Sequence, residues 1–420
     1  MADARLRRDI AWNLIPVALL AIIGLGLNFA IAGWWGAGAL GIFNLVTIAY
    51  FVLAVAGACG IQYSVLRSVA EAVDDRDRVA SVVVGALVPN LVLALAATAI
   101  FVASRHALAD VFDHREVSEG MLWAAPGLFC FAVNKVMFGI VNGMRRMRTF
   151  AIYTSLRYIL IAVGIGLAHA IDLSSARLAG IWSFVEGVML IVLSIEILAT
   201  VAVRRARDWR RWMRDHLAYG VRGLPATLAY EINTKLDVWM LGAAGFTKEL
   251  VGIYSLAAGI NEGATQLAVI VQNNVNPMMA AALAANRPDD VTGLISRTRR
   301  WFVPAFVGAC AIGAFAFPVI IPRLVADPAF AAGAQPFAIL MIGLALASAY
   351  LPFTQLLLMA DLPGWHTMYM VVVVGTNLIA NRLLIPHYGL SGAAAATSIA
   401  VIASALLIRT LARGKVHVAC

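Results

Sequence analysis

The sequence has no Asp, Glu, Lys, Arg or His between Ile10 and Leu66. A water-soluble domain does not contain such a stretch, since charged residues make up about 25% of an ordinary soluble protein. About 20 apolar residues span the hydrocarbon core of a bilayer, so the stretch is long enough for two membrane helices. The segment WWGAG at 34–38 predicts the turn between them, because aromatic rings suit the headgroup region and glycine interrupts helices.

Charged residues are scarce in the whole chain, at 13%, whereas hydrophobic residues make up 62%. The four cysteines have neither metal-ligand nor disulfide spacing. The sequence contains no Walker loop, no glycine-rich phosphate cradle and no nucleophile elbow. His106 and His114 share a longer loop with several acids, but their spacing fits no zinc signature. We therefore expect no metal, no cofactor and no enzymatic activity.

The hydropathy pattern predicts an all-α polytopic membrane protein with about twelve transmembrane helices. Most Lys and Arg residues fall on one side of the predicted spans, which places both termini in the cytoplasm. The net charge of +9 is thereby explained by orientation, and we expect no nucleic-acid partner. The predicted spans are 10–33, 39–66, 79–104, 119–143, 149–170, 178–203, 221–243, 250–284, 299–321, 333–360, 363–385 and 389–412.

Two short motifs recur at nearly equal separations. LGIFNL, which contains Gly41, opens the second span, and VGIYSL, which contains Gly252, opens the eighth. LAG with Gly180 opens the sixth span, and LSG with Gly392 opens the twelfth. This repeat predicts two homologous six-helix lobes related by a pseudo-twofold axis along the membrane normal, with a substrate site between them. The expected divisions are a first lobe at 1–203, a cytoplasmic linker at 204–222, a second lobe at 223–412 and a cytoplasmic tail at 413–420.

The linker is rich in arginine, with tryptophans between the basic residues. We interpret it as a segment that lies on anionic headgroups, since each basic residue near the membrane surface adds about 1 kcal/mol of attraction. The alternative is a nucleic-acid site, because arginines with interleaved tryptophans also suit nucleic acid. The arginines are Arg204, Arg205, Arg207, Arg210, Arg211, Arg214 and Arg222.

Charged residues inside a span are costly and are by default functional or paired. Lys135 and Arg157 are equally far along the chain from the turn at Arg146, so both lie about 16 Å above it on neighbouring helices. Two cations at one depth would suit a diphosphate. In the alternative interpretation they form internal ion pairs with Glu186 and Glu196.

The seventh and eighth spans are also polar. Glu231 and Lys235 are four residues apart on one helical face and favour an ion pair, while Asp237 lies on another face without a local partner. The eighth span carries Glu262 and a run of amides, so it should face a water-filled cavity or the seam between the lobes. The polar residues expected to line a cavity are Asn28, Asn261, Gln272 and Asn273.

Several segments resemble the Wzx-type polysaccharide flippases of the multidrug/oligosaccharidyl-lipid/polysaccharide exporter (MOP) superfamily. They cover the second, seventh, eighth and twelfth spans. The segments are LGIFNLVTIAY, GIQYSVLRSVAE, GLPATLAYEINTKLDVWMLG, VGIYSLAAGI and LIPHYGLSGAAAATSIA. The resemblance implies a fold like that of the MATE transporters, in a monomer of a bacterial inner membrane. It further implies translocation of a polyprenyl-diphosphate-linked oligosaccharide from the cytoplasmic to the outer leaflet, for O-antigen, capsule or exopolysaccharide assembly.

On this interpretation Lys135, Arg157 and Lys235 bind the diphosphate. Glu231, Asp237 and Glu262 either bind coupling protons or sodium, or balance the cations. The main alternative is a MATE-type cation or drug antiporter, but such proteins carry an acid in the first span and this sequence has none between Ile10 and Leu66. A lipid II flippase usually has more spans. A membrane-bound polysaccharide polymerase, a different class, would be expected to have a large outer loop.

Overall fold

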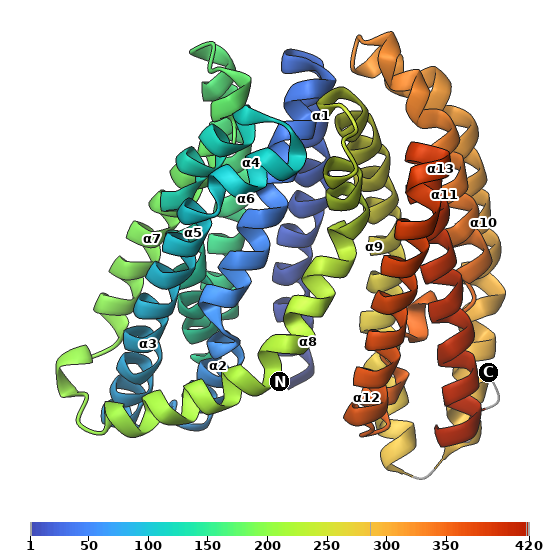
Figure 1. Ribbon diagram of the computed structural model, residues 1–420. Helices are drawn as coiled ribbons and strands as arrows, with labels where there is room; N and C mark the ends of the chain where they lie inside the picture. The colour runs from blue at the N-terminus through green and yellow to red at the C-terminus, as the bar shows by residue number, and fades with distance from the viewer. Residues whose placement is uncertain (1, 286, 417, 419–420) are drawn as a thin grey trace. The chain divides into compact units, whose positions relative to one another are not determined.

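The computed structural model describes residues 2–285, 287–416 and 418, and every regular element among them is a helix (Figure 1). The predicted all-α fold is confirmed. The short helix α4 was not expected, because the sequence predicts an irregular outer loop there. In chain order the elements are α1 (Ala2–Ala58), α2 (Ile61–Glu71), α3 (Arg76–Ala103), α4 (Arg105–Phe112), α5 (Arg115–Gly143), α6 (Met147–Ala170), η1 (Ser175–Arg177), α7 (Gly180–Thr200), η2 (Val203–Arg205), α8 (Trp209–Ala243), α9 (Lys248–Ala284), α10 (Pro288–Leu324), η3 (Pro328–Gly333), α11 (Ala334–Ala347), η4 (Leu351–Phe353), α12 (Leu356–Met359), α13 (Pro363–Leu411) and η5 (Ala412–Val416).

The described residues include eight helical segments long and apolar enough to cross a membrane. Large apolar side chains cover the outward faces of these helices, as at Ile312 and Phe315 of α10, which are 72% and 82% exposed. Such exposure would be unfavourable in water and is what a lipid-facing surface requires. The chain is therefore an integral membrane protein. Helices α8 and α9 are outside this set of eight because their sequences carry more polar residues.

Helix α1 folds back on itself at Gly36, as the sequence predicts. Gly36 has φ 85° and ψ 175°, a conformation that an L-residue with a side chain rarely adopts. Asn44 donates to Oδ1 of Asn28 at 3.5 Å, and these two residues are equally far along the chain from Gly36. This bond requires the chain to reverse at the glycine, so α1 is a hairpin of two membrane helices.

Helix α13 has the same construction. Gly389, with φ 57° and ψ −129°, interrupts its helical geometry. Beyond it, Gly392 lies so close to Leu384 that a Cβ atom on Gly392 would be 2.3 Å from the Leu384 carbonyl oxygen. The predicted division between the last two spans therefore falls where the structure places the turn.

The chain divides into two compact units, one of the residues up to Trp35 and 42–232, the other of 36–41 and the residues from Asn233 onward. In the first unit α5 packs against α2, α3 and α7. Their shared core consists of small and branched apolar side chains, such as Val65, Val83 and Leu193. This core fixes the relative positions of α5 and α7, the two helices that carry charged residues of the candidate site.

In the second unit α11 packs against α9, α10 and α13. The predicted span 333–360 is wrong in its second part, because α11 ends at Ala347 and gives way to short turns, η4 and α12. Side chains of neighbouring helices bond to this irregular stretch: Gln272 donates to Thr354 at 2.6 Å, and Arg299 donates to the Ala349 carbonyl oxygen at 2.7 Å. Irregular backbone at membrane depth needs such partners, since lipid supplies none.

The segment 36–41 packs against the start of α9 through the two repeat glycines. A Cβ atom on Gly252 would lie 1.8 Å from the Ala37 carbonyl oxygen, and one on Gly41 would lie 2.0 Å from the Lys248 carbonyl oxygen. Both contacts are with backbone, which cannot rotate away as a side chain can. Glycine is therefore required at both positions by close packing.

Gly252→Ala is expected to destabilise the protein by at least about 2 kcal/mol, because the added methyl group forces the two backbones apart. Gly259→Ala on the same helix is the matched control, since nothing lies within 4 Å of the Cβ position there. Alanine should stabilise the helix at that position by up to about 1 kcal/mol. Thermal denaturation in detergent measures both, and equal melting temperatures for the two variants would contradict the close packing.

Candidate functional site

A buried ion pair joins α6 and α7 in the first unit. Arg157 of α6 donates from Nε at 2.6 Å and from Nη2 at 2.5 Å to the same oxygen, Oε1 of Glu186 on α7. The Glu186 side chain is fully buried, whereas that of Arg157 is 20% exposed. Asn134 of α5 donates to the other carboxylate oxygen at 2.9 Å and to the Glu186 carbonyl oxygen at 3.0 Å. Glu186 of α7 is therefore held by residues of two other helices, α5 and α6.

Lys135 lies beside this pair on α5. Its Nζ is 5.5 Å from the centre of the Phe131 ring, and the Arg157 guanidinium is 4.4 Å from the same ring. Lys135 also interacts electrostatically with Glu231 of α8 and with Arg157. Among the residues that the structure describes, Lys135 has no direct ion pair. Two of the three predicted diphosphate ligands, Lys135 and Arg157, thus lie against the same aromatic ring.

The alternative pairing of these cations is correct in part. Arg157 does pair with Glu186, but Glu196 is bonded to Arg146 and accepts a hydrogen bond from Tyr153 at 2.9 Å. Arg146 is at the turn before α6, and its pairing with Glu196 was not predicted. Glu196 therefore neutralises Arg146 and does not pair with Lys135.

The second unit holds the remaining predicted charges. Lys235 forms an ion pair with Glu262, and both side chains are partly exposed. Asp237 is buried, and its side-chain partners are remote along the chain: Tyr254 donates to its carboxylate at 2.5 Å and Thr397 at 3.2 Å. These partners come from α9 and α13, which no local sequence pattern connects to Asp237.

The predicted cavity-lining amides are distributed over several elements. Asn28 of α1 donates to the Gly24 carbonyl oxygen, and Gln272 of α9 is buried against Thr354. The Oδ1 atom of Asn261 is buried without a hydrogen-bond partner in the described part of the chain. Asn273 is exposed.

The described residues contain no group of three or more His, Cys, Asp or Glu side chains that could hold a metal ion. Where α4 meets α5, Ser118 Oγ is 3.4 Å from His106 Nδ1. His106 also accepts a hydrogen bond from Arg105. Both ring nitrogens of His106 therefore have hydrogen-bond partners within the protein.

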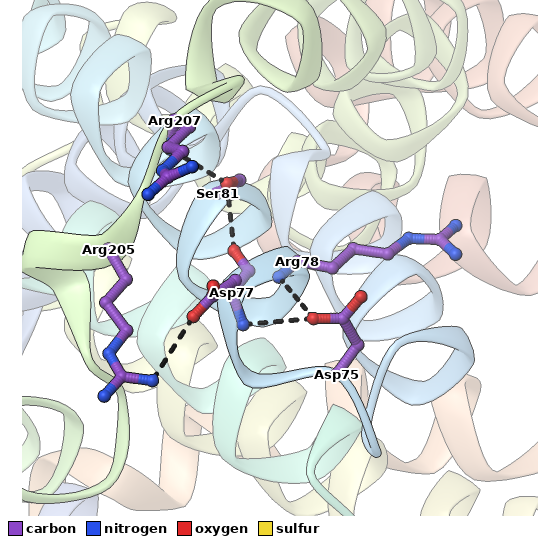
Figure 2. A network of polar contacts seen from close by, with 6 residues as sticks. All are labelled: Asp75, Asp77, Arg78, Ser81, Arg205 and Arg207. Atoms are coloured by element: carbon purple, nitrogen blue, oxygen red, sulfur yellow. Dashed lines mark hydrogen bonds and ion pairs between the residues drawn. The ribbon is translucent and has the colours of Figure 1, made fainter.

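The linker between α7 and α8 is attached to the start of α3 by a polar network (Figure 2). Asp75 caps α3 by accepting from the backbone N–H groups of Asp77 and Arg78 at 3.1 and 3.0 Å. The Nη1 atom of Arg205 lies 3.5 Å from Oδ1 of Asp77. The backbone N–H of Arg207 donates to Ser81 Oγ at 3.2 Å. The linker is therefore anchored by hydrogen bonds from both its backbone and its side chains.

His216 fixes the first half of α8 to α2 and α3. Its Nε2 lies 3.3 Å from the Val82 carbonyl oxygen, which can only accept, so in the neutral ring Nδ1 is the acceptor for the Ser64 hydroxyl at 2.8 Å. His216 belongs to the linker, outside the predicted spans. Burial lowers its pKa, with smaller opposing effects from the Val82 carbonyl and Asp215. The neutral ring is therefore the form that fits this site.

This arrangement predicts that the packing of α8 on α2 and α3 weakens in acid. The folded-state pKa is lowered, so its contribution is complete above the unfolded pKa of about 6.5 and is lost as pH falls below that value. Amide hydrogen exchange over Trp209–Gly220, corrected for intrinsic rates, should lose about tenfold of its protection between pH 8 and pH 5.5. His216→Gln should remove this pH dependence and Asp215→Asn should retain it. The same dependence in His216→Gln would assign it to another group.

The fold is that of the MOP superfamily of transporters. The structure matches an inward-facing multidrug resistance MATE family transporter of that superfamily with a TM-score of 0.82 at 15% identity, over 97% of this chain and 98% of that one. It matches the lipid II flippase MurJ with a TM-score of 0.77 at 15% identity, over 96% and 87%. A MOP superfamily transporter from Pyrococcus furiosus matches with a TM-score of 0.61 at 14% identity, over 97% and 94%. The predicted MATE-like fold is confirmed.

The sequence itself identifies the family within this fold. The profile of the polysaccharide biosynthesis protein family matches residues 6–284. The chain belongs to that family, and the family expected from the motifs is confirmed. No curated protein matches the chain significantly.

Proposed function

We propose that this protein translocates a polyprenyl-diphosphate-linked oligosaccharide from the cytoplasmic to the outer leaflet of a bacterial inner membrane, for surface polysaccharide assembly. Membership of the polysaccharide biosynthesis protein family and a fold shared with transporters and a flippase support this proposal. The observation that carries it is the pairing of Lys135 and Arg157 over one aromatic ring inside a membrane protein.

The charges of this cluster favour an anionic substrate. Arg157 uses Nε and Nη2 for Glu186, and in the described part of the chain its Nη1 has no hydrogen bond. Lys135 keeps three donors on Nζ, and Glu231 is near enough to act on it electrostatically. A diphosphate could bind Nζ of Lys135 and Nη1 of Arg157 together, as charge-assisted hydrogen bonds to phosphate are among the strongest in proteins.

The rest of the mechanism follows from the repeat. We propose that the lobes 1–203 and 223–412 rock about a substrate path while the linker 204–222 connects them, in a monomer. The glycan would pass along the amides Asn28, Asn261, Gln272 and Asn273, with Lys235 as a third phosphate ligand. The polyprenyl tail would stay in the bilayer. Such a protein needs no bond-forming residues, so we infer transport rather than catalysis.

A liposome assay tests the proposal directly. A polyprenyl-diphosphate oligosaccharide is placed on one leaflet of liposomes that contain the purified protein, and its arrival on the other leaflet is followed with a glycan-cleaving enzyme. We expect acceleration over protein-free liposomes. If the glycolipid stays where it was placed while a cationic dye leaves under an ion gradient, the protein is an antiporter and the proposal is wrong.

The buried carboxylate of Asp237 supports a second part of the proposal, namely coupling to protons or sodium. A carboxylate that is buried between α8, α9 and α13, where it accepts hydrogen bonds from two hydroxyl groups and the Val238 backbone N–H, is a candidate cation ligand. Glu262 and Glu231 would share this task or balance the cations.

Asp237→Asn keeps the size of the side chain but removes its charge and replaces one acceptor oxygen with an NH2 donor. We expect stimulation of transport by an imposed gradient to fall from about tenfold to less than about twofold, while transport without a gradient persists. Asp289→Asn, which alters an exposed acid of α10, serves as the control. Unchanged gradient dependence in Asp237→Asn would remove the coupling role from this residue.

A further inference from the structure

The first half of α8 and the segment before it expose a row of arginines. Arg210, Arg211, Arg214 and Arg222 of α8 are exposed, while Trp212, His216 and Gly220 lie on the packed side of the same helix. Arg204 and Arg205 of η2 and Arg207 are also exposed, and only Asp208 and Asp215 carry the opposite charge in this part of the chain. We call the seven exposed residues Arg204, Arg205, Arg207, Arg210, Arg211, Arg214 and Arg222 the arginine face.

Close packing holds this helix in place. A Cβ atom on Gly220 would be 2.0 Å from the Cys59 carbonyl oxygen, and one on Gly85 of α3 would be 2.6 Å from Cβ of Trp212. The hydrogen bonds of His216 to Ser64 and Val82, and of Arg207 to Ser81, also attach this part of the chain to α2 and α3. The first half of α8 accordingly runs across the ends of α2 and α3 (Figure 1), so the arginine face points away from the first unit.

Most of the arginine face is electrostatically uncompensated. Arg205 is near Asp77, and Arg210 lies 5.5 Å from the centre of the Trp209 ring. In the described part of the chain, the side chains of Arg204, Arg211 and Arg214 have no ion pair and no hydrogen bond. A fixed surface of unpaired guanidinium groups attracts a dense negative charge.

The exposed apolar residues of α7, the helix that precedes the arginine face, indicate which anion lies near that face. Ile191, Ile195 and Leu198 on the outward face of α7 are 63%, 64% and 67% exposed, as expected for side chains in contact with lipid tails. Arg204 follows Leu198 by six residues and lies just beyond the end of α7 at Thr200. Where lipid tails contact Leu198, the phosphates of the same leaflet lie at about the level of the arginine face.

We propose that the arginine face binds the anionic headgroups of membrane phospholipids, so that the first half of α8 is an interfacial helix. The charge of the headgroups complements the arginines, and Trp209 and Trp212 are residues that favour the headgroup region. A soluble polyanion such as a nucleic acid would not account for the lipid-facing residues of α7 beside it. This inference is independent of the proposed substrate.

Lipid binding to the purified full-length protein, counted by native mass spectrometry, tests the proposal. The probes are phosphatidylglycerol, which is anionic, and phosphatidylcholine, which has no net charge. The wild-type protein should bind phosphatidylglycerol about tenfold more tightly than phosphatidylcholine, and the preference should weaken in high salt. The triple variant R204Q/R211Q/R214Q should reduce it to less than about twofold.

Two variants make the result specific. R204K/R211K/R214K keeps the charge and should keep the preference. R115Q/R323Q/R382Q removes three exposed arginines elsewhere and should also keep it. The proposal is overturned if the glutamine variant of the arginine face retains the wild-type preference, or if wild type binds both lipids equally. It is also overturned if a single-stranded oligonucleotide displaces the lipid at equal phosphate concentration.

Discussion

Replacing Lys135 by glutamine is expected to lower glycolipid translocation by about 100-fold. The change removes the proposed charge-assisted hydrogen bond to the substrate phosphate, and such bonds contribute up to about 3 kcal/mol. Lys135 also lacks a direct ion pair in the described chain, so its charge is available to a ligand. The initial rate in liposomes, at matched protein content, measures the effect.

Lys135→Arg should recover most of the activity because it keeps the charge beside Phe131. Arg297→Gln is the matched control, since Arg297 is an exposed cation of α10. Normal translocation by Lys135→Gln would exclude Lys135 from substrate binding. The same outcome would leave the family and the fold unaffected, since neither was inferred from this residue.

Replacing Glu186 by glutamine is expected to destabilise the first unit by about 3 kcal/mol. Glutamine has nearly the same shape and still accepts the hydrogen bond from Asn134, so no cavity is formed. What is lost is the negative charge that Arg157 requires, because breaking a buried pair leaves an uncompensated charge in the interior. The free energy of unfolding in an SDS titration measures this loss.

The double variant Arg157→Met/Glu186→Gln separates charge from shape. It removes both charges, so stability should return close to that of the wild type. Glu71→Gln breaks the exposed pair of Glu71 with Arg67 and should have no measurable effect. If the double variant is less stable than Glu186→Gln alone, the pair contributes more by its packing than by mutual neutralisation.

The sequence predicted best where one residue determines the local structure. Hydropathy located most of the helices, and glycine with tryptophan located the turn at Gly36, since only glycine adopts that backbone conformation freely. The sequence could suggest Arg157 and Glu186 as an ion pair because charged residues inside membrane helices need partners. Their depth along the helices was calculable from the rise per residue.

The sequence could not predict contacts that depend on helix rotation. Asp237 and Thr397 are 160 residues apart, and their hydrogen bond exists only because α8 and α13 pack side by side. Likewise, Lys235 pairs with Glu262 of the next helix, although Glu231 is nearer along the chain. The irregular stretch after Ala347 is as apolar as a helix, and the side chains that satisfy its backbone belong to other helices.

The single-residue turns at Gly36 and Gly389 have a mechanical consequence. A hinge needs residues whose backbone angles can change without breaking contacts. In α1 one residue separates two helices that are already joined by Asn28 and Asn44, so there is no slack chain between them. Each hairpin should therefore move as a stiff lever, and any bending during the transport cycle has to occur away from these two turns.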